Sequence, residues 1–254
     1  MDMPRNTFKH AIAKGQLQIG LWCSLCGTVA TEIVSHSGYD WLLLDTEHSP
    51  NDVTDILGHL QAAQAGTASC IVRPAWNDMV LIKRFLDVGV QTLLIPYVQT
   101  PQEAADAVAY TRYPLRGVRG VAGTTRATRF GRVKDYFKRA EEELCVLVQV
   151  ETRLGLDNLD AIANTDGVDG VFIGPADLSA GLGHLGNIPH LEVQKAIDDA
   201  IKRIRKAGKA AGILAPVEAD ARRYLDQGCL FVAVGADVGL LARESEKLCA
   251  KFKS

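Results

Sequence analysis

The sequence predicts an α/β protein, a closed (β/α)8 TIM barrel with an N-terminal capping helix. Eight short apolar runs alternate with segments of helical periodicity along the chain. The runs are apolar at nearly every position, as strands of a parallel sheet are when helices cover the sheet. The length of 254 residues is close to that of one such barrel. We therefore expect residues 1–254 to form a single barrel domain.

The elements follow in order. Residues 6–14 form a short amphipathic pattern that Asn6 or Thr7 can cap and that ends at Gly15. The expected strands are residues 19–23, 41–45, 69–73, 92–95, 145–150, 171–173, 211–214 and 231–234. The expected helices are residues 30–37, 52–64, 78–88, 101–110, 156–164, 191–207, 218–227 and 238–252. Glycine follows most of these helices, as a helix C-terminus favours.

A doubly wound sheet is the alternative architecture. It would normally carry a G-x-G-x-x-G turn after the first strand, whereas this chain has C-S-L-C-G-T there. The barrel is therefore the better prediction. Residues 113–136 form a long connection rich in glycine and arginine between the fourth and fifth strands. A connection of this length is usually functional. Its arginines could meet an anionic substrate or another subunit, or could simply be solvated: Arg116, Arg119, Arg126, Arg129 and Arg132.

Composition excludes several classes of function. The net charge is -2, and the basic residues are scattered among acids, which argues against a nucleic-acid partner. No apolar run approaches the roughly 20 residues of a membrane span. The N-terminus lacks an apolar signal region, so we expect a cytoplasmic protein with reduced thiols. Cys23 and Cys26 form one C-x-x-C pair without a second pair at zinc-site spacing, so buried thiols are the better interpretation.

Two apolar runs end at acidic residues, Glu151 and Asp177. Barrel enzymes place their chemistry on the loops that follow the strand C-termini. Neighbouring strands lie about 4.8 Å apart, so two carboxylates at adjacent strand ends can share one divalent cation. Oxygen-rich surroundings suit Mg²⁺ or Mn²⁺ better than zinc. The sequence therefore predicts a metal site at this end of the barrel.

Other polar residues follow strand ends on the same face. Arg73 offers a fixed positive fork for a carboxylate or a developing enolate. His48 is the general acid/base candidate, because imidazole titrates near neutral pH. Gly174 begins a segment whose free N–H groups could hold a substrate carboxylate. A 2-oxo acid chelating the metal would lose its α-proton more readily. The remaining histidines receive no catalytic role: His10, His36, His59, His184 and His190.

Each of these residues also has a purely structural interpretation. Asp177 could be a helix N-cap, and Glu151 could pair with Arg153. Arg73 could pair with Asp45, and His48 could close a turn before Pro50. The convergence of several such groups on one barrel face favours the functional interpretation.

At these residues the chain resembles a known family. The segments L-L-D-T-E-H-S-P-N-D, I-V-R-P, V-Q-V-E-T-R-L-G and D-G-V-F-I-G-P-A-D-L-S resemble the HpcH/HpaI aldolases, which are class II pyruvate aldolases on a (β/α)8 barrel. The resemblance spans almost the whole chain. The tail and the segment G-L-G-H-L-G-N resemble most closely the branch acting on 2-keto-3-deoxy-glucarate and 5-keto-4-deoxy-glucarate. Thr46 and Ser49 stand where the family usually carries glycine and alanine, and the 122–129 loop also differs.

The resemblance implies roles for particular residues. Glu151 and Asp177 would ligate Mg²⁺, with Mn²⁺ or Co²⁺ as alternatives. His48 would act as base, and Arg73 would stabilise the transition state. An aspartate matching Asp87 would couple to the histidine, across a subunit boundary in a homo-hexamer. The pyruvate moiety would be surrounded by Gln149, Ala176, Asp177 and Leu214.

The implied reaction is reversible retro-aldol cleavage of a 4-hydroxy-2-oxo acid to pyruvate and an aldehyde such as tartronate semialdehyde. A sister branch cleaves 4-hydroxy-2-oxoheptanedioate and gives succinate semialdehyde. A lyase or decarboxylase acting through the same enolate is a further alternative. A Schiff-base aldolase would need a lysine on an inner strand, and none of the eight runs contains one. A metabolite-binding barrel without catalysis is disfavoured by the presence of His48 and Arg73.

Overall fold

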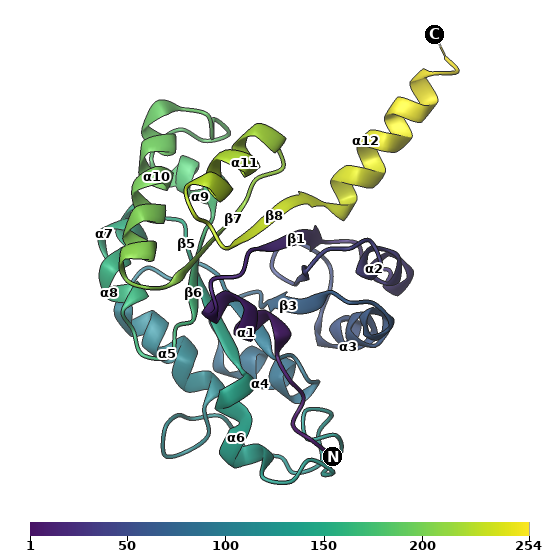
Figure 1. Cartoon of the computed structure of the whole chain (residues 1–254), viewed down its shortest axis with the longest axis vertical. Helices are drawn as coiled ribbons and strands as arrows, with labels where there is room; N and C mark the ends of the chain where they lie inside the picture. Colours follow the sequence, from purple (N-terminus) through teal and green to yellow (C-terminus); the bar gives the residue numbers. More distant parts are fainter. Residues whose placement is uncertain (254) are drawn as a thin grey trace.

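A computed structural model describes residues 1–253 and confirms the predicted barrel. Eight parallel strands close in sequential order, with β8 paired to β1 (Figure 1). They are β1 (Gln18–Cys23), β2 (Trp41–Asp45), β3 (Ser69–Arg73), β4 (Thr92–Ile95), β5 (Cys145–Val150), β6 (Gly170–Ile173), β7 (Ala210–Leu214) and β8 (Phe231–Ala236). Each predicted strand is present, with bounds that differ by at most two residues.

Helices surround most of the barrel. They are α1 (Thr7–Ala13), α2 (Thr28–Ser35), α3 (Val53–Ala62), α4 (Met79–Asp87), α5 (Pro101–Thr111), α6 (Tyr136–Glu143), α7 (Arg153–Asp157), α8 (Leu159–Ala163), α9 (Pro175–Gly181), α10 (Leu191–Lys206), α11 (Glu218–Asp226) and α12 (Asp237–Ala250), with a 3-10 turn η1 (Ala63–Ala65). None of those within residues 1–253 is both long enough and apolar enough to cross a bilayer.

Two helical predictions need correction. Residues 156–164, expected as one helix, form α7 and α8, with Asn158 as C-cap of the first and N-cap of the second. The connection 113–136 was expected to be irregular throughout, but its last residue begins α6. This helix has few apolar residues, and it buries only Tyr136 and Ala140, which lie one turn apart on the side facing the barrel.

The connection before α6 is held in place by a buried arginine. The Arg119 side chain is 1% exposed, lies over the Tyr113 ring at 4.7 Å and donates to Asp87 Oδ1 at 3.1 Å. Arg116 forms an ion pair with Glu141 at 2.6 Å. Burial excludes Arg119 from contact with a substrate, so this arginine serves the fold.

Helix α1 closes the N-terminal end of the barrel, as predicted. Asn6 caps it by accepting from Lys9 N, and Phe8 is fully buried. The Phe8 ring makes edge contacts with Trp41 and Phe231, with centroids 6.1 and 5.8 Å apart. A Cβ atom at Gly20 would lie 2.1 Å from the Trp41 ring, so only glycine leaves room for this aromatic layer. The lower barrel is therefore a packed core.

The opposite end of the barrel carries polar side chains. Every second side chain of a strand points into the barrel, and the last inward position on several strands is polar. Trp41 and Leu43 pack in the barrel interior, so Asp45, two residues further along the strand, faces the mouth. Strand register pairs Asp45 with Arg73 on β3. On β5, Leu147 belongs to the interior layer and is followed by Gln149. The polar residues thus gather at the C-terminal mouth.

Helix α12 extends away from the barrel (Figure 1). Three of its apolar residues lie three and seven positions apart, on one side of the helix, and are exposed: Val238 41%, Leu241 62% and Leu248 59%. Phe252, two residues beyond the end of α12, is 83% exposed. An exposed stripe of this kind at helical spacing marks an interaction surface.

We predict that Phe8→Ala destabilises the protein by about 3–5 kcal/mol, because it removes a fully buried ring and leaves a cavity under the aromatic layer. Urea denaturation at fixed protein concentration measures the change. Phe130→Ala is the matched control, since the Phe130 side chain is 62% exposed and its loss should cost less than about 0.5 kcal/mol. Equal losses in both variants would contradict the assigned role of α1.

Candidate active site

Arg73 is the centre of a buried polar cluster at the mouth. It is 5% exposed, and its Nε and Nη2 atoms donate to the two carboxylate oxygens of Asp45 at 2.9 and 2.7 Å. The Trp22 indole N–H donates to Asp45 at 3.1 Å, and the Arg73 guanidinium lies 4.8 Å from the Trp22 ring centre. Burial raises the pKa of Asp45, but these hydrogen bonds outweigh it and hold that pKa below its usual value. The ion pair between Arg73 and Asp45, one of the structural interpretations offered by the sequence, is therefore present in the fold.

The sequence places Glu47 at the end of the second strand beside His48, but it received no role in the sequence analysis. Its Oε2 atom lies 2.8 Å from Arg73 Nη1, so one guanidinium serves two carboxylates. Burial raises the pKa of Glu47 despite this partner, and the charges of Asp45 and Asp177 raise it further. Its place two residues after Asp45 was a usable signal, because alternate positions share one direction while the chain remains extended.

Glu151 is buried at the end of β5. Its carboxylate accepts from Gln149 Nε2 at 2.5 Å and from the Tyr97 backbone N–H at 2.9 Å. A Cβ atom at Gly174 would lie 2.2 Å from Glu151 Oε2, so the glycine makes the space in which this carboxylate sits. Tyr97 holds a left-handed backbone, with φ of 56°, which is strained for a residue other than glycine.

The electrostatics of Glu151 are unusual. Burial raises its pKa from 4.5 to about 7, and the nearby charges of Asp177 and Glu47 act in the same direction. The hydrogen bonds from Gln149 and Tyr97 lower the pKa but do not compensate. The structural alternative, a pair with Arg153, is not formed, since Arg153 pairs with Glu192 at 3.4 Å.

The remaining predicted substrate residues lie at neighbouring strand ends. Ala176 and Asp177 are exposed in the first turn of α9, whose N-cap is Gly174. Asp177 therefore is not the N-cap of this helix, and its carboxylate is free to face the mouth. Leu214 is the last residue of β7 and is partly buried. All three follow or end strands β6 and β7, next to β5.

His48 lies on the same face. Its side chain is 65% exposed, and its Nε2 atom is 3.9 Å from Glu47 Oε1. The loop around it is fixed from below, since the Ser49 hydroxyl donates to the Asp45 carbonyl at 2.5 Å and the Thr46 hydroxyl donates to the Arg73 carbonyl at 2.7 Å. The imidazole is thus solvent-accessible on an ordered loop.

Asp87 lies elsewhere. It is the last residue of α4, near the start of β4 and therefore at the N-terminal end of the barrel. Its carboxylate accepts from Arg119. Within residues 1–253 it makes no recorded contact with His48.

The mouth holds more negative than positive charge. Asp45, Glu47, Glu151 and Asp177 face one guanidinium, and the guanidinium is engaged by the first two. Among residues 1–253 Glu151 has hydrogen-bond partners but no ion pair, and the Oε1 atom of Gln149 is buried without a hydrogen-bond partner. A buried carboxylate normally has a positive partner or a metal. The donor set consists of oxygens and suits a hard divalent cation.

A (β/α)8 barrel with this acid-rich mouth belongs to the class of barrel enzymes, and comparison with known proteins defines it further as a carbon–carbon lyase of the aldolase type. The chain belongs to the HpcH/HpaI aldolase/citrate lyase family, whose pattern matches residues 18–243.

Three curated relatives illustrate the similarity. A pyruvate aldolase of Rhizobium etli is 58% identical over 252 residues, covering 99% of both chains. A 4-hydroxy-2-oxo-heptane-1,7-dioate aldolase of Klebsiella pneumoniae is 56% identical, covering 97% of this chain and 94% of the relative. A 5-keto-4-deoxy-D-glucarate aldolase of the same organism is 50% identical, covering 98% and 97%. Relatives of comparable identity thus carry different substrate names.

We predict that Glu151 makes the cation-free protein less stable as the pH rises. A pKa of about 7 in the folded state, above 4.5, means that the folded protein binds the proton more tightly than the unfolded chain. Stability is therefore lost as the pH rises from 4.5 to about 7. Glu151→Gln should exceed the native protein in stability by about 1–3 kcal/mol at about pH 8. The gain should shrink towards about pH 5, as urea denaturation with EDTA would show.

Glu218→Gln, at an exposed surface position, should give no such pH-dependent difference. Added Mg²⁺ should stabilise the native protein at about pH 8 but not Glu151→Gln. A pH-independent difference between the native protein and Glu151→Gln would contradict the burial of an unpaired carboxylate.

Proposed function

We propose that this single-domain chain is a divalent-metal-dependent class II aldolase that reversibly cleaves a 4-hydroxy-2-oxo acid to pyruvate and an aldehyde. The observation that carries the proposal is Glu151, a buried carboxylate with a pKa of about 7, seated in the space left by Gly174 and close to Asp177. Glu151 and Asp177 would hold the cation, which we propose to be Mg²⁺, with Mn²⁺ or Co²⁺ as substitutes. When bound, the cation would polarise the keto group and stabilise negative charge next to it.

The chain's own residues supply the rest of the reaction. In the cleavage direction His48 takes the proton of the 4-hydroxyl group, the bond between C3 and C4 breaks, and the aldehyde leaves. The electron pair remains on C3 as an enolate, which a proton converts to pyruvate. Arg73 cannot rotate, because Asp45 and Glu47 hold it, so its positive charge is fixed before the reaction begins.

The pyruvate moiety would lie between β5 and β7. The first-turn N–H groups of Ala176 and Asp177 have no partner within α9 and can donate to a carboxylate. The unpaired Oε1 atom of Gln149 can accept from a water molecule or a hydroxyl. Leu214 would form the apolar side of the pocket. The six free cysteines are consistent with a reducing compartment, and we propose a cytoplasmic location.

The aldehyde is the less defined half of the substrate. Tartronate semialdehyde, from 2-keto-3-deoxy-glucarate, is our first proposal, and succinate semialdehyde is the alternative. A related lyase or decarboxylase acting through the same enolate is the other candidate. A Schiff-base mechanism is disfavoured by the structure, because none of the eight strands carries a lysine.

We expect synthesis from pyruvate and a panel of aldehydes, including both semialdehydes, to require a divalent cation. EDTA should abolish the reaction, Mg²⁺ or Mn²⁺ should restore it, and borohydride should trap no adduct.

Arg73→Lys should lower kcat by about 10²–10³, because the lysine ammonium cannot bridge Asp45 and Glu47 as the planar guanidinium does. Glu218→Gln should retain full activity. Chelator-resistant activity with a borohydride adduct would overturn the proposal, and decarboxylation of oxaloacetate without aldol synthesis would favour the alternative.

We propose further that the protein forms a homo-oligomer, a hexamer by family resemblance, in which α12 packs on a second copy. In the outer ring of helices of a (β/α)8 barrel, the helix after β8 would cover strands β8 and β1 and lie next to α2. Here α12 projects away, and α2 leaves Val29 and Ile33 exposed at 66% and 64% (Figure 1). The exposed stripe of α12 matches this uncovered surface in character. Asp87 would then meet His48 only between subunits, since the two lie at opposite ends of one barrel.

Replacing the apolar stripe of α12 should disrupt this assembly. We predict that the double substitution Leu241→Glu and Leu248→Glu lowers the mass measured by light scattering, because it places two charges in a desolvated interface. Glu246→Gln, an exposed polar position on the same helix, should leave the mass unchanged. An unaltered mass in the double variant would exclude α12 from the interface.

A further inference from the structure

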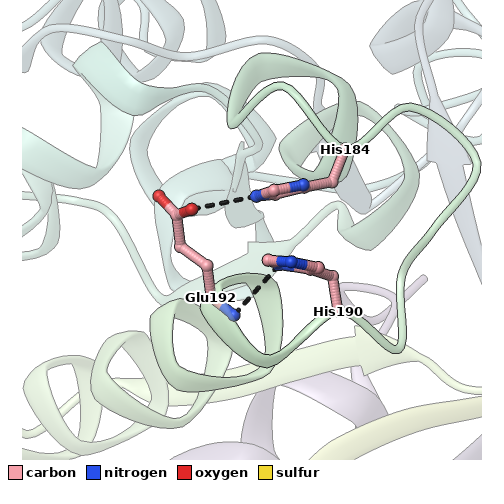
Figure 2. A group of neighbouring side chains, drawn as sticks. All are labelled: His184, His190 and Glu192. Atoms are coloured by element: carbon pink, nitrogen blue, oxygen red, sulfur yellow. Dashed lines mark hydrogen bonds and ion pairs between the residues drawn. The ribbon is translucent and has the colours of Figure 1, made fainter.

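A second group of potential metal ligands lies outside the carboxylate mouth. It consists of His184, His190 and Glu192 (Figure 2). Figure 2 shows the two imidazole rings stacked over each other, with the Glu192 carboxylate directed towards His184. One donor atom from each residue lies within 4.8 Å of the other two. Sequence reasoning gave these histidines no catalytic role and did not connect them with Glu192.

His184 and His190 lie on the loop 182–190 between α9 and α10, and Glu192 lies in the first turn of α10. Helices of the barrel run back towards the strand N-termini, so the start of α10 lies at the same end as the mouth. A Cβ atom at Gly181 would lie 3.7 Å from Thr152 Cα, so the end of α9 packs on the segment that follows Glu151. Arg153 of that segment reaches Glu192 at 3.4 Å. The group therefore lies beside the segments that carry Glu151 and Asp177.

The loop is ordered by its own backbone. His184 N donates to Ser179 O at 2.7 Å, Asn187 N donates to His184 O at 2.8 Å, and His190 N donates to Asn187 O at 3.0 Å. Gly183 and Gly186 have φ values of 86° and 73°, which glycine adopts without strain. These contacts bring the two histidines face to face without help from a ligand.

Each of the three side chains offers one atom that could ligate a metal. The ring centroids of His184 and His190 are 3.5 Å apart and the ring planes differ by 21°, so the two rings stack. His184 Nε2 lies 2.9 Å from Glu192 Oε2. His190 Nδ1 accepts from the Glu192 backbone N–H at 3.3 Å, a long hydrogen bond that leaves this lone pair weakly engaged.

We infer that His184, His190 and Glu192 form a second cation site, specific for a borderline transition ion of the Zn²⁺ class and separate from the carboxylate pair at the mouth. Two imidazole nitrogens and one carboxylate oxygen are a donor set that zinc accepts while leaving a fourth position for water. Mg²⁺ prefers oxygen donors and would remain at the mouth. The ion would replace the hydrogen bond between His184 and Glu192, and the stacked rings would turn so that both nitrogen lone pairs point to it.

One competitor must be displaced. Arg153 and Glu192 are 59% and 50% exposed, and an ion pair so exposed contributes little stability. A divalent ion held by three ligands would therefore displace Arg153 from the Glu192 carboxylate. Once bound, it would tie the loop 182–190 to the start of α10 and free Arg153 from that contact.

Titration of the full-length protein with Zn²⁺ against a chromophoric chelator tests the site without any measurement of activity. The native protein should show two classes of binding. His184→Gln and Glu192→Gln should each weaken one class by about tenfold or more and leave the other unchanged. Glu151→Gln should do the converse. His36→Gln, an exposed histidine on another face, should titrate like the native protein.

Cu²⁺ used as a paramagnetic probe identifies the ligands. The native protein should show imidazole nitrogen coupling that is reduced in His184→Gln and in His190→Gln, but retained in His36→Gln and His48→Gln. Circular dichroism of the metal-free variants establishes that they fold, and Glu192→Gln provides a test that leaves both histidines in place. Identical Zn²⁺ titrations for the native protein, His184→Gln and Glu192→Gln would overturn the inference, whether or not the protein proves to be an aldolase.

Discussion

The distribution of charge around Arg73 is the constraint on which the site depends. One guanidinium, held over Trp22, is shared by Asp45 and Glu47. Because both carboxylates engage it, it is not available to Glu151, the next acid at the mouth. The fold therefore keeps one buried carboxylate with a raised pKa and no protein cation beside it. This is the electrostatic arrangement that a hard divalent ion would complete.

The barrel produces that arrangement by simple geometry. Along β2 and β5, every second side chain points into the barrel: large apolar residues fill the N-terminal part of the interior, and polar residues occupy the next layer, at the mouth. The same strands therefore form the packed core at one end and the candidate active site at the other. Glycine adjusts both ends: Gly20 makes room for Trp41 below, and Gly174 makes room for Glu151 above. The left-handed backbone of Tyr97 completes the upper site by turning its N–H to Glu151.

The proposed and the inferred cation sites would lie on one face of the barrel. The carboxylates Glu151 and Asp177 offer oxygen atoms, whereas His184, His190 and Glu192 offer two nitrogens and one oxygen. These donor sets prefer different ions: Mg²⁺ favours the carboxylate oxygens, and Zn²⁺ favours the imidazole nitrogens. Arg153 lies between them in sequence and space, since it follows Glu151 by two residues and pairs with Glu192. The inferred cation site would thus act on the order of the active-site loops and not on the reaction itself.

The sequence by itself determined the strands, the closed barrel and the end at which polar residues gather. The order of apolar runs and helical segments, and the residue that ends each run, can be read directly from the linear chain. It also singled out Arg73, Glu151 and Asp177, each placed just at or after a strand end. It did not reveal that Arg73 divides between Asp45 and Glu47, that Gly174 shapes the seat of Glu151, or that His184, His190 and Glu192 converge. These contacts join residues that are far apart in the sequence or lie on a loop that folds back on itself. Side-chain packing in the folded protein sets the distances between them, and a periodic pattern in the sequence does not encode those distances.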